Sequence, residues 1–168
     1  MSKNPRSKKI QTAAVILMII AAASVLFLIL RSGSEHFLVL TDMNTGKKIA
    51  EYPIKDNDRF SITFIHSVNK SPLTDIYEIR NGDIYVVETH YHGFGAGVQT
   101  EIEEGQTLSY ASDGTMIVSG FDKLIPSLSY FVGTVSDHVL KIHGREISLR
   151  ELCGRNCKVR FSCENKLF

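Results

Sequence analysis

A histidine stands at the end of an alternating apolar run, directly before a polar cluster. Residues 59–75 read RFSITFIHSVNKSPLTD. Side chains alternate between the two faces of a strand, and one face here carries Phe60, Ile62, Phe64 and His66. Pro72 closes the strand, because proline cannot donate a hydrogen bond to the sheet. The pattern therefore predicts a strand that begins in the core and ends beside a polar site.

The residues of this cluster that could bind a ligand are His66, Ser67, Lys70 and Asp75. A hydrolase would need a serine hydrogen-bonded to the histidine. Neighbours on a strand point to opposite faces, so His66 and Ser67 cannot form that pair. The chain also lacks the G-x-S-x-G nucleophile motif. Two interpretations remain: an imidazole at the mouth of a pocket beside Lys70 and Asp75, or a histidine that serves only the core.

A second candidate lies on the strand expected over residues 84–92. Glu88, His90 and His92 are spaced two residues apart, so they should share one face, while Tyr85, Val87, Thr89 and Tyr91 occupy the other. Such a row could supply two or three metal ligands. The sequence nominates no fourth ligand, and the alternative is a solvated face opposite a core face. We therefore predict no metal ion.

The loop Phe94, Gly95, Ala96 and Gly97 follows this strand. A dinucleotide fingerprint needs a third glycine and a helix directly after it, and neither is present here. The loop could be a tight crossing where another backbone comes close. Its amides could also bind an anionic group. No cofactor is predicted.

Turn signals separate many short apolar runs, as in an all-β protein. Asn81-Gly82 between two such runs predicts a two-residue hairpin, and Asp113-Gly114 predicts another turn. The Ser148-x-x-Glu151 spacing predicts one short C-terminal helix that ends near Gly154. Strands are expected over residues 37–40, 48–53, 59–66, 76–80, 84–92, 108–111, 116–118, 130–135, 138–142 and 159–162. The fold class is an antiparallel β-sandwich or partly open barrel.

Residues 10–30 form an apolar run that as a helix would be about 31 Å long, enough to span a bilayer. Four basic residues precede this run, and the first acidic residue is Glu35, so the N-terminus should be cytoplasmic. The expected organisation is a cytoplasmic tail (1–9), a transmembrane helix or signal anchor (10–30), a tether (31–36) and an extracytoplasmic β-domain (37–168). Cleavage near Ser32 or Ser34 is the alternative.

The expected β-domain is mildly acidic. Five of the 19 lysines and arginines precede residue 32, so 14 remain against 18 acidic residues, a net charge of −4. This charge argues against a nucleic-acid partner. The three cysteines Cys153, Cys157 and Cys163 lie in the last 16 residues. Outside the membrane an oxidised pair with one cysteine left over is expected, and the spacing leaves the pairing open. A free or intermolecular thiol is the alternative.

Two stretches together resemble a bacterial family, domain-of-unknown-function family 1850. The matching residues are His66-Ser67-Val68-Asn69-Lys70-Ser71-Pro72, Asp75, Glu88-Thr89 and Gly93-Phe94-Gly95-Ala96-Gly97. Val98-Gln99 replaces the usual Met-Pro, and His90 and His92 are not part of the family pattern. Members are typically encoded beside TAXI-type TRAP transporters of organic acids. The resemblance therefore implies an accessory role beside a solute transporter.

Function is thus expected to be that of a membrane-anchored extracytoplasmic binding module with a small organic anion as its ligand. The expected binding residues are His66, Ser67, Lys70, Asp75, Glu88 and the loop Phe94–Gly97. The alternative is an extracytoplasmic metal-dependent or hydrolytic enzyme built on the region of His66, Glu88, His90 and His92. The binding module is preferred, because the spacings assemble neither a nucleophile–base pair nor a complete ligand set.

Overall fold

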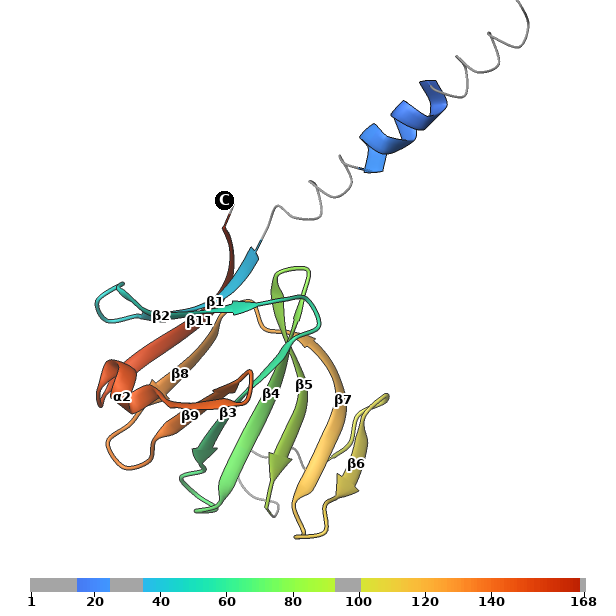
Figure 1. Ribbon diagram of the computed structural model, residues 1–168. Coiled ribbons are helices and arrows are strands. Elements are labelled where there is room, and N and C mark those ends of the chain that lie inside the picture. Colours follow the sequence, from blue (N-terminus) through green and yellow to red (C-terminus); the bar gives the residue numbers. More distant parts are fainter. Residues whose placement is uncertain (1–14, 25–34, 93–100, 167–168) are drawn as a thin grey trace, which may run out of the picture. The chain divides into compact units, whose positions relative to one another are not determined.

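The computed structural model describes residues 15–24, 35–92 and 101–166 (Figure 1). The chain separates into two compact units, one with Met1–Ser34 and Lys166–Phe168 and the other with Glu35–Asn165. In the first unit residues 15–24 are helical. This helix exposes six consecutive large apolar side chains, from Val15 to Ile20, by 50–72%. In the described part of the chain, no helix has both the length and the hydrophobicity that a bilayer span requires. The predicted span 10–30 continues on both sides into residues that are not described.

The second unit consists of strands and one short helix. Its elements are β1 (Glu35–Asp42), β2 (Lys48–Ile54), β3 (Arg59–Ile65), β4 (Pro72–Arg80), β5 (Asp83–Tyr91), β6 (Thr107–Tyr110), β7 (Met116–Leu124), β8 (Leu128–Val132), β9 (His138–Ile142), β10 (Arg145–Ser148), α2 (Leu149–Cys153) and β11 (Cys157–Lys166). They form a four-stranded sheet, β2-β1-β11-β8, and a seven-stranded sheet, β10-β9-β3-β4-β5-β7-β6. Neighbours along the chain, such as β3 with β4 and β4 with β5, pair antiparallel. The predicted all-β sandwich is confirmed.

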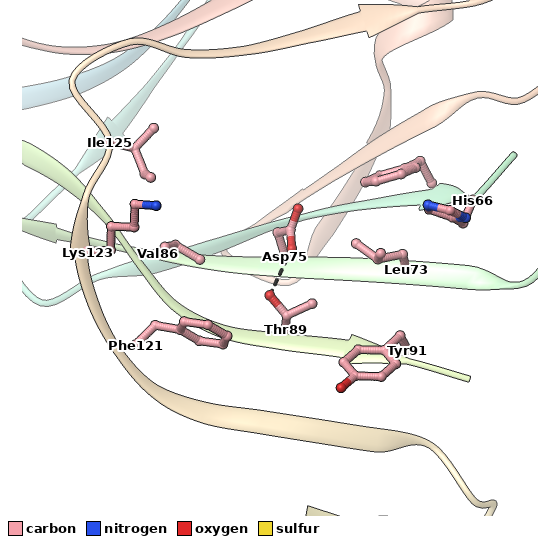
Figure 2. A pocket seen from close by; sticks show the side chains of 10 residues that line it. His66, Leu73, Asp75, Val86, Thr89, Tyr91, Phe121, Lys123 and Ile125 are labelled. Atoms are coloured by element: carbon pink, nitrogen blue, oxygen red, sulfur yellow. Dashed lines mark hydrogen bonds between the residues drawn. The ribbon is translucent and has the colours of Figure 1, made fainter. Parts of the chain in front are cut away.

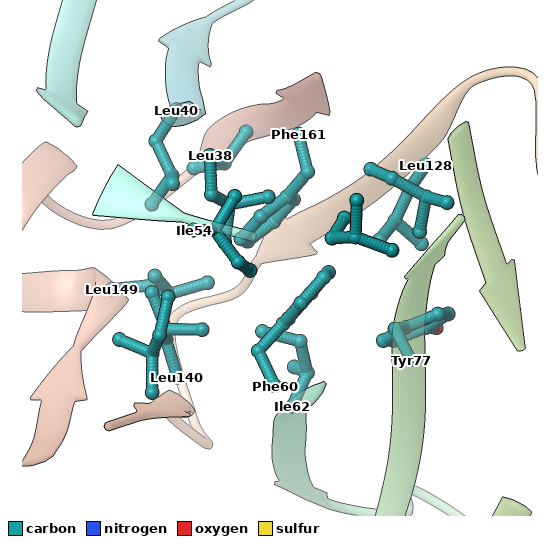
Figure 3. Close-up of a cluster of buried hydrophobic side chains, with 14 of the residues drawn as sticks. Leu38, Leu40, Ile54, Phe60, Ile62, Tyr77, Leu128, Leu140, Leu149 and Phe161 are labelled. Atoms are coloured by element: carbon teal, nitrogen blue, oxygen red, sulfur yellow. The ribbon is translucent and has the colours of Figure 1, made fainter. Parts of the chain in front are cut away.

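The main core lies between the two sheets (Figure 3). Leu38 and Phe161 come from the four-stranded sheet, and Phe60, Ile62 and Tyr77 come from the seven-stranded sheet. The Phe60 ring stacks on Tyr77 and on Phe161, with centroid distances of 5.2 and 6.1 Å. Phe60 and Ile62 are buried, whereas Ser61 and Thr63, which alternate with them, are partly exposed. The predicted alternation along this strand is therefore confirmed.

The four-stranded sheet covers only part of the longer sheet. Residues of β9, β3 and β4 supply most of the larger sheet's share of the main core, whereas β6 and β7 supply none of its buried residues. A smaller cluster of Leu73, Tyr91 and Val118 forms on β4, β5 and β7 instead. Figure 1 shows β7 and β6 extending beyond the region where the sheets overlap. The inner face of β6 and β7 is therefore not part of the main core.

Local signals predicted several elements accurately. Asn81 and Gly82 both have positive φ, at 53° and 82°, and Arg80 pairs directly with Asp83, as in a two-residue hairpin. The Ser148 side chain accepts a hydrogen bond from the Glu151 backbone amide at 3.0 Å, which caps helix α2 as expected.

The expectation of an oxidised cysteine pair is not met. Cys153, Cys157 and Cys163 are all free thiols. Burial raises the pKa of Cys157 to about 12 and that of Cys163 to about 11. Both groups are therefore protonated at neutral pH, and the thiol is a weaker nucleophile than the thiolate.

Two bulges change which side chains of β5 and β7 face inward. The pairing of β5 with β4 shifts at Val87, and the pairing of β5 with β7 shifts around Gly120. The predicted face is therefore right for Thr89 and Tyr91, which line one pocket, but it misses Val86, which shares that face. After Gly120, the residues of β7 that face inward are Phe121 and Lys123.

Gly120 is required at its bulge for two reasons. Its φ is +84°, and an added Cβ would lie 2.3 Å from the Gly105 carbonyl oxygen. Gly114 is a matched control, because its φ is +86° and an added Cβ would meet nothing within 4 Å. We expect Gly114→Ala to lower the free energy of unfolding by about 1–2 kcal/mol for the left-handed backbone alone. Gly120→Ala should lower it further, as measured by chemical denaturation. Equal losses in the two variants would contradict the close approach at Gly120.

Candidate ligand-binding site

A pocket of about 440 Å³ is lined by residues of the seven-stranded sheet and of the segment after β7 (Figure 2). Its apolar walls come from β3, β4, β5, β7 and the segment after β7: Phe64, Leu73, Val86, Tyr91, Phe121 and Ile125. Four polar side chains line it: His66, Asp75, Thr89 and Lys123. A concave, mostly apolar site with a few polar groups is the usual form of a small-molecule pocket.

Asp75 lies at the centre of the pocket and is held by hydroxyl groups from both sheets. The Tyr130 hydroxyl on β8 donates to one carboxylate oxygen at 2.8 Å, and the Thr89 hydroxyl on β5 donates to the other at 2.9 Å. The Tyr77 and Tyr130 oxygens are 2.6 Å apart. Since Tyr130 gives its only hydrogen to Asp75, Tyr77 donates to Tyr130. The result is a hydrogen-bonded chain from Tyr77 through Tyr130 to Asp75.

Burial controls the protonation of this chain. Desolvation raises the pKa of Asp75, although the hydrogen bonds from Tyr130 and Thr89 oppose that effect. Burial and the nearby Asp75 carboxylate also raise the pKa values of Tyr77 and Tyr130, so both remain neutral donors at physiological pH. The raised pKa of Asp75 indicates that its carboxylate is less stable here than in water.

His66 follows directly after β3 and marks one end of the pocket. Its backbone amide donates to the Ser71 carbonyl and its own carbonyl accepts from the Lys70 amide, both at 2.9 Å, which closes the turn between β3 and β4. The ring atom Nδ1 accepts from the Asn69 amide at 3.4 Å. The neutral ring therefore carries its hydrogen on Nε2 and can donate it to a ligand.

Lys123 marks the other end of the pocket (Figure 2). It pairs with Val86 across β5 and β7. No acidic side chain of the described residues lies within ion-pairing distance of it. Sequence reasoning missed this lysine, because the bulge at Gly120 decides that it faces inward. The neighbouring Asp122 faces the other way and pairs with Arg80.

The other residues predicted for the site either do not line this pocket or belong to residues that the structure does not describe. Ser67 and Lys70 are exposed on the turn that follows His66. Glu88 pairs with Ile76 rather than with Asp75, and so faces away from the pocket. The loop Phe94–Gly97 falls in residues 93–100, which are not described. The structure thus brings His66 and Asp75 to one pocket, and the ring of His66 bonds to the Asn69 amide rather than to either expected carboxylate.

The candidate metal-ligating row of Glu88, His90 and His92 is engaged in other contacts. The His90 ring bonds to the Glu88 carboxylate, and His92 Nε2 lies 3.0 Å from the Thr115 hydroxyl. Across the described residues, no three His, Cys, Asp or Glu side chains are grouped so as to hold a metal ion.

One family matches the chain. Residues 60–149 match the family described as "Domain of unknown function (DUF1850)". The chain belongs to this DUF1850 family. The matched segment includes every pocket residue, from Phe64 to Ile125, and also Tyr130. No curated protein and no solved structure matches the chain. In this DUF1850 chain, the pocket therefore lies wholly within the family domain.

The direction of the Asp75 pKa shift predicts how stability depends on pH. A carboxyl with a raised pKa in the folded state binds its proton more tightly there than in the unfolded chain. Its contribution to stability is therefore lost as pH rises from the ordinary aspartate pKa through the raised one. Asp75→Asn removes this titration. We expect the melting temperature of the wild type, relative to Asp75→Asn, to fall as pH rises from about 4.

Asp83→Asn is the matched control, since Asp83 is exposed beside the β4–β5 turn. The melting temperature of the wild type relative to Asp83→Asn should not fall in the same way as pH rises. A wild type that gains stability over Asp75→Asn on raising the pH would show that the hydrogen bonds outweigh burial.

Proposed function

We propose that this DUF1850 protein is a binding module that holds a small organic anion with an apolar body in the pocket between Lys123 and His66. The main support for the proposal is that Lys123 lies at the rim of an apolar pocket and has no acidic partner among the described residues. A ligand carboxylate would complete its charge pairing, and the apolar walls would cover the rest of the ligand.

The polar groups of the pocket fit binding better than catalysis. His66 Nδ1 is occupied by the Asn69 amide, and both oxygens of Asp75 already accept hydrogen bonds from the protein. Ser67 is exposed on the turn rather than directed into the pocket. These groups are positioned to recognise a ligand, so we prefer a binding function to that of a metal-dependent or hydrolytic enzyme.

The proposal includes attachment to the cytoplasmic membrane, with the β-domain outside and a solute transporter as the partner. Its support is the apolar run 10–30 with basic residues before it, together with the exposed apolar side chains of the helix 15–24. The transporter is proposed as the partner because the resemblance to the DUF1850 family implies an accessory role beside one. Co-purification of the chain with transporter subunits from membranes tests that partner.

Binding should depend on Lys123. Purified full-length chain in detergent is titrated calorimetrically with hexanoate, octanoate and phenylacetate, with protein-free micelles as the blank. We expect Lys123→Met to weaken binding of these acids about tenfold or more, since a charge-assisted hydrogen bond contributes about 1.5–3 kcal/mol. Lys141→Met is the control, because Lys141 is an exposed lysine on β9 outside the pocket. The proposal fails if the wild type binds none of the acids, or if both variants bind them equally.

Attachment and orientation can be tested in cells. Protease added to intact spheroplasts should degrade the β-domain, and the domain should sediment with membranes before the treatment. Protection of the domain from protease would place it inside the cell. Recovery of a soluble form beginning near Glu35 would show that the N-terminal segment is cleaved.

A further inference from the structure

The pocket presents donors at its ends and an acceptor at its centre. Lys123 and His66 Nε2 offer hydrogens. Thr89 gives its only hydroxyl hydrogen to Asp75, so it faces a ligand only as an acceptor. Asp75 lines the pocket and accepts one hydrogen bond at each oxygen. An ionised carboxylate has about four acceptor positions, so the hydrogen bonds from Tyr130 and Thr89 do not fill it.

This central acceptor would be poorly matched by a purely apolar ligand. The walls around it are hydrocarbon and aromatic: Phe64, Leu73, Val86, Phe121 and Ile125. None of these five side chains can donate a conventional hydrogen bond to Asp75, and Tyr91 is the one other wall residue that carries a hydroxyl. A ligand that covers the carboxylate with methylene groups would exclude water and leave acceptor positions unsatisfied, which is costly for a charged group.

The strand pairing sets the order of the cation and this acceptor along the pocket. Lys123 pairs with Val86, and Val86 pairs with Tyr77. Asp75 lies two residues from Tyr77 on β4, which corresponds to about 7 Å along the strand. His66 lies beyond Asp75 in the same direction, since Phe64 pairs with Leu73. The order along the pocket is therefore cation, acceptor, apolar stretch and histidine donor.

We propose that the ligand is a hydroxylated organic acid, whose carboxylate pairs with Lys123 and whose hydroxyl donates to Asp75. This inference rests on the proposed binding function and adds the ligand class to it. Lys123 sets affinity for the acid group. Asp75 discriminates a hydroxylated acid from the same acid without its hydroxyl.

Two matched pairs of probes test the inference: 6-hydroxyhexanoate with hexanoate, and 4-hydroxyphenylacetate with phenylacetate. Each is titrated calorimetrically into the full-length chain in detergent. The hydroxylated member of at least one pair should bind about tenfold or more tightly than its partner, the size of a hydrogen bond to a charged group. Asp75→Asn should reduce that ratio, whereas Lys123→Met should weaken both members and preserve it.

The outcomes separate this inference from the proposed function. If both members of each pair bind equally to the wild type, the hydroxyl assignment is overturned and the anion site stands. If none of the four acids binds, both fail. Should Asp75→Asn not fold, Thr89→Val serves in its place. Loss of the Thr89 hydrogen bond frees a further acceptor position on Asp75, so the preference for the hydroxylated acid should be kept or increased. A Thr89→Val protein that lost this preference would contradict the role given to Asp75.

Discussion

The hydrogen bonds that join the partly buried Asp75 carboxylate to hydroxyl groups of both sheets are the interaction on which the rest of this structure depends. Asp75 belongs to the core face of β4, yet it cannot be buried without partners. Tyr130 reaches it from the other sheet, and Tyr77 supports Tyr130 in turn. The aromatic rings of this region pack on one another, with Phe64 5.8 Å from Tyr130 and 5.0 Å from His138 between ring centroids. The hydrogen-bonded chain thus marks the place where the common core ends and the pocket begins.

The pocket follows from a mismatch in the size of the two sheets. One sheet has seven strands and the other has four. Beyond β4, the strands β5 and β7 therefore direct apolar side chains toward a space that the smaller sheet does not cover. The bulge at Gly120 brings Phe121 and Lys123 into this face and sends Asp122 to the other, where it pairs with Arg80. A single extra residue in one strand therefore decides which charge the pocket presents.

The sequence predicted what local rules determine. The alternation from Phe60 to His66, the hairpin at Asn81-Gly82 and the Ser148 cap each depend on residues close together in the chain, and all three are confirmed. His66 and Asp75 were also correctly chosen as neighbours of one pocket. Bulges depend on pairing partners far away in the sequence, so the periodicity of β5 placed Thr89 and Tyr91 correctly on the inner face but missed Val86. Lys123, Thr89 and Tyr130 were missed for the same reason, since tertiary pairing alone makes them neighbours of Asp75.

The central claim is that the uncovered inner face of the seven-stranded sheet receives the ligand. The most direct measurement is methyl NMR of the isotope-labelled full-length chain during titration with octanoate. We expect the methyl signals of Leu73, Val86 and Ile125 to shift on binding, whereas those of Leu38, Leu40 and Val159 in the main core should not. Signals that shift only outside the pocket, or that do not shift at all at saturating acid, would contradict it.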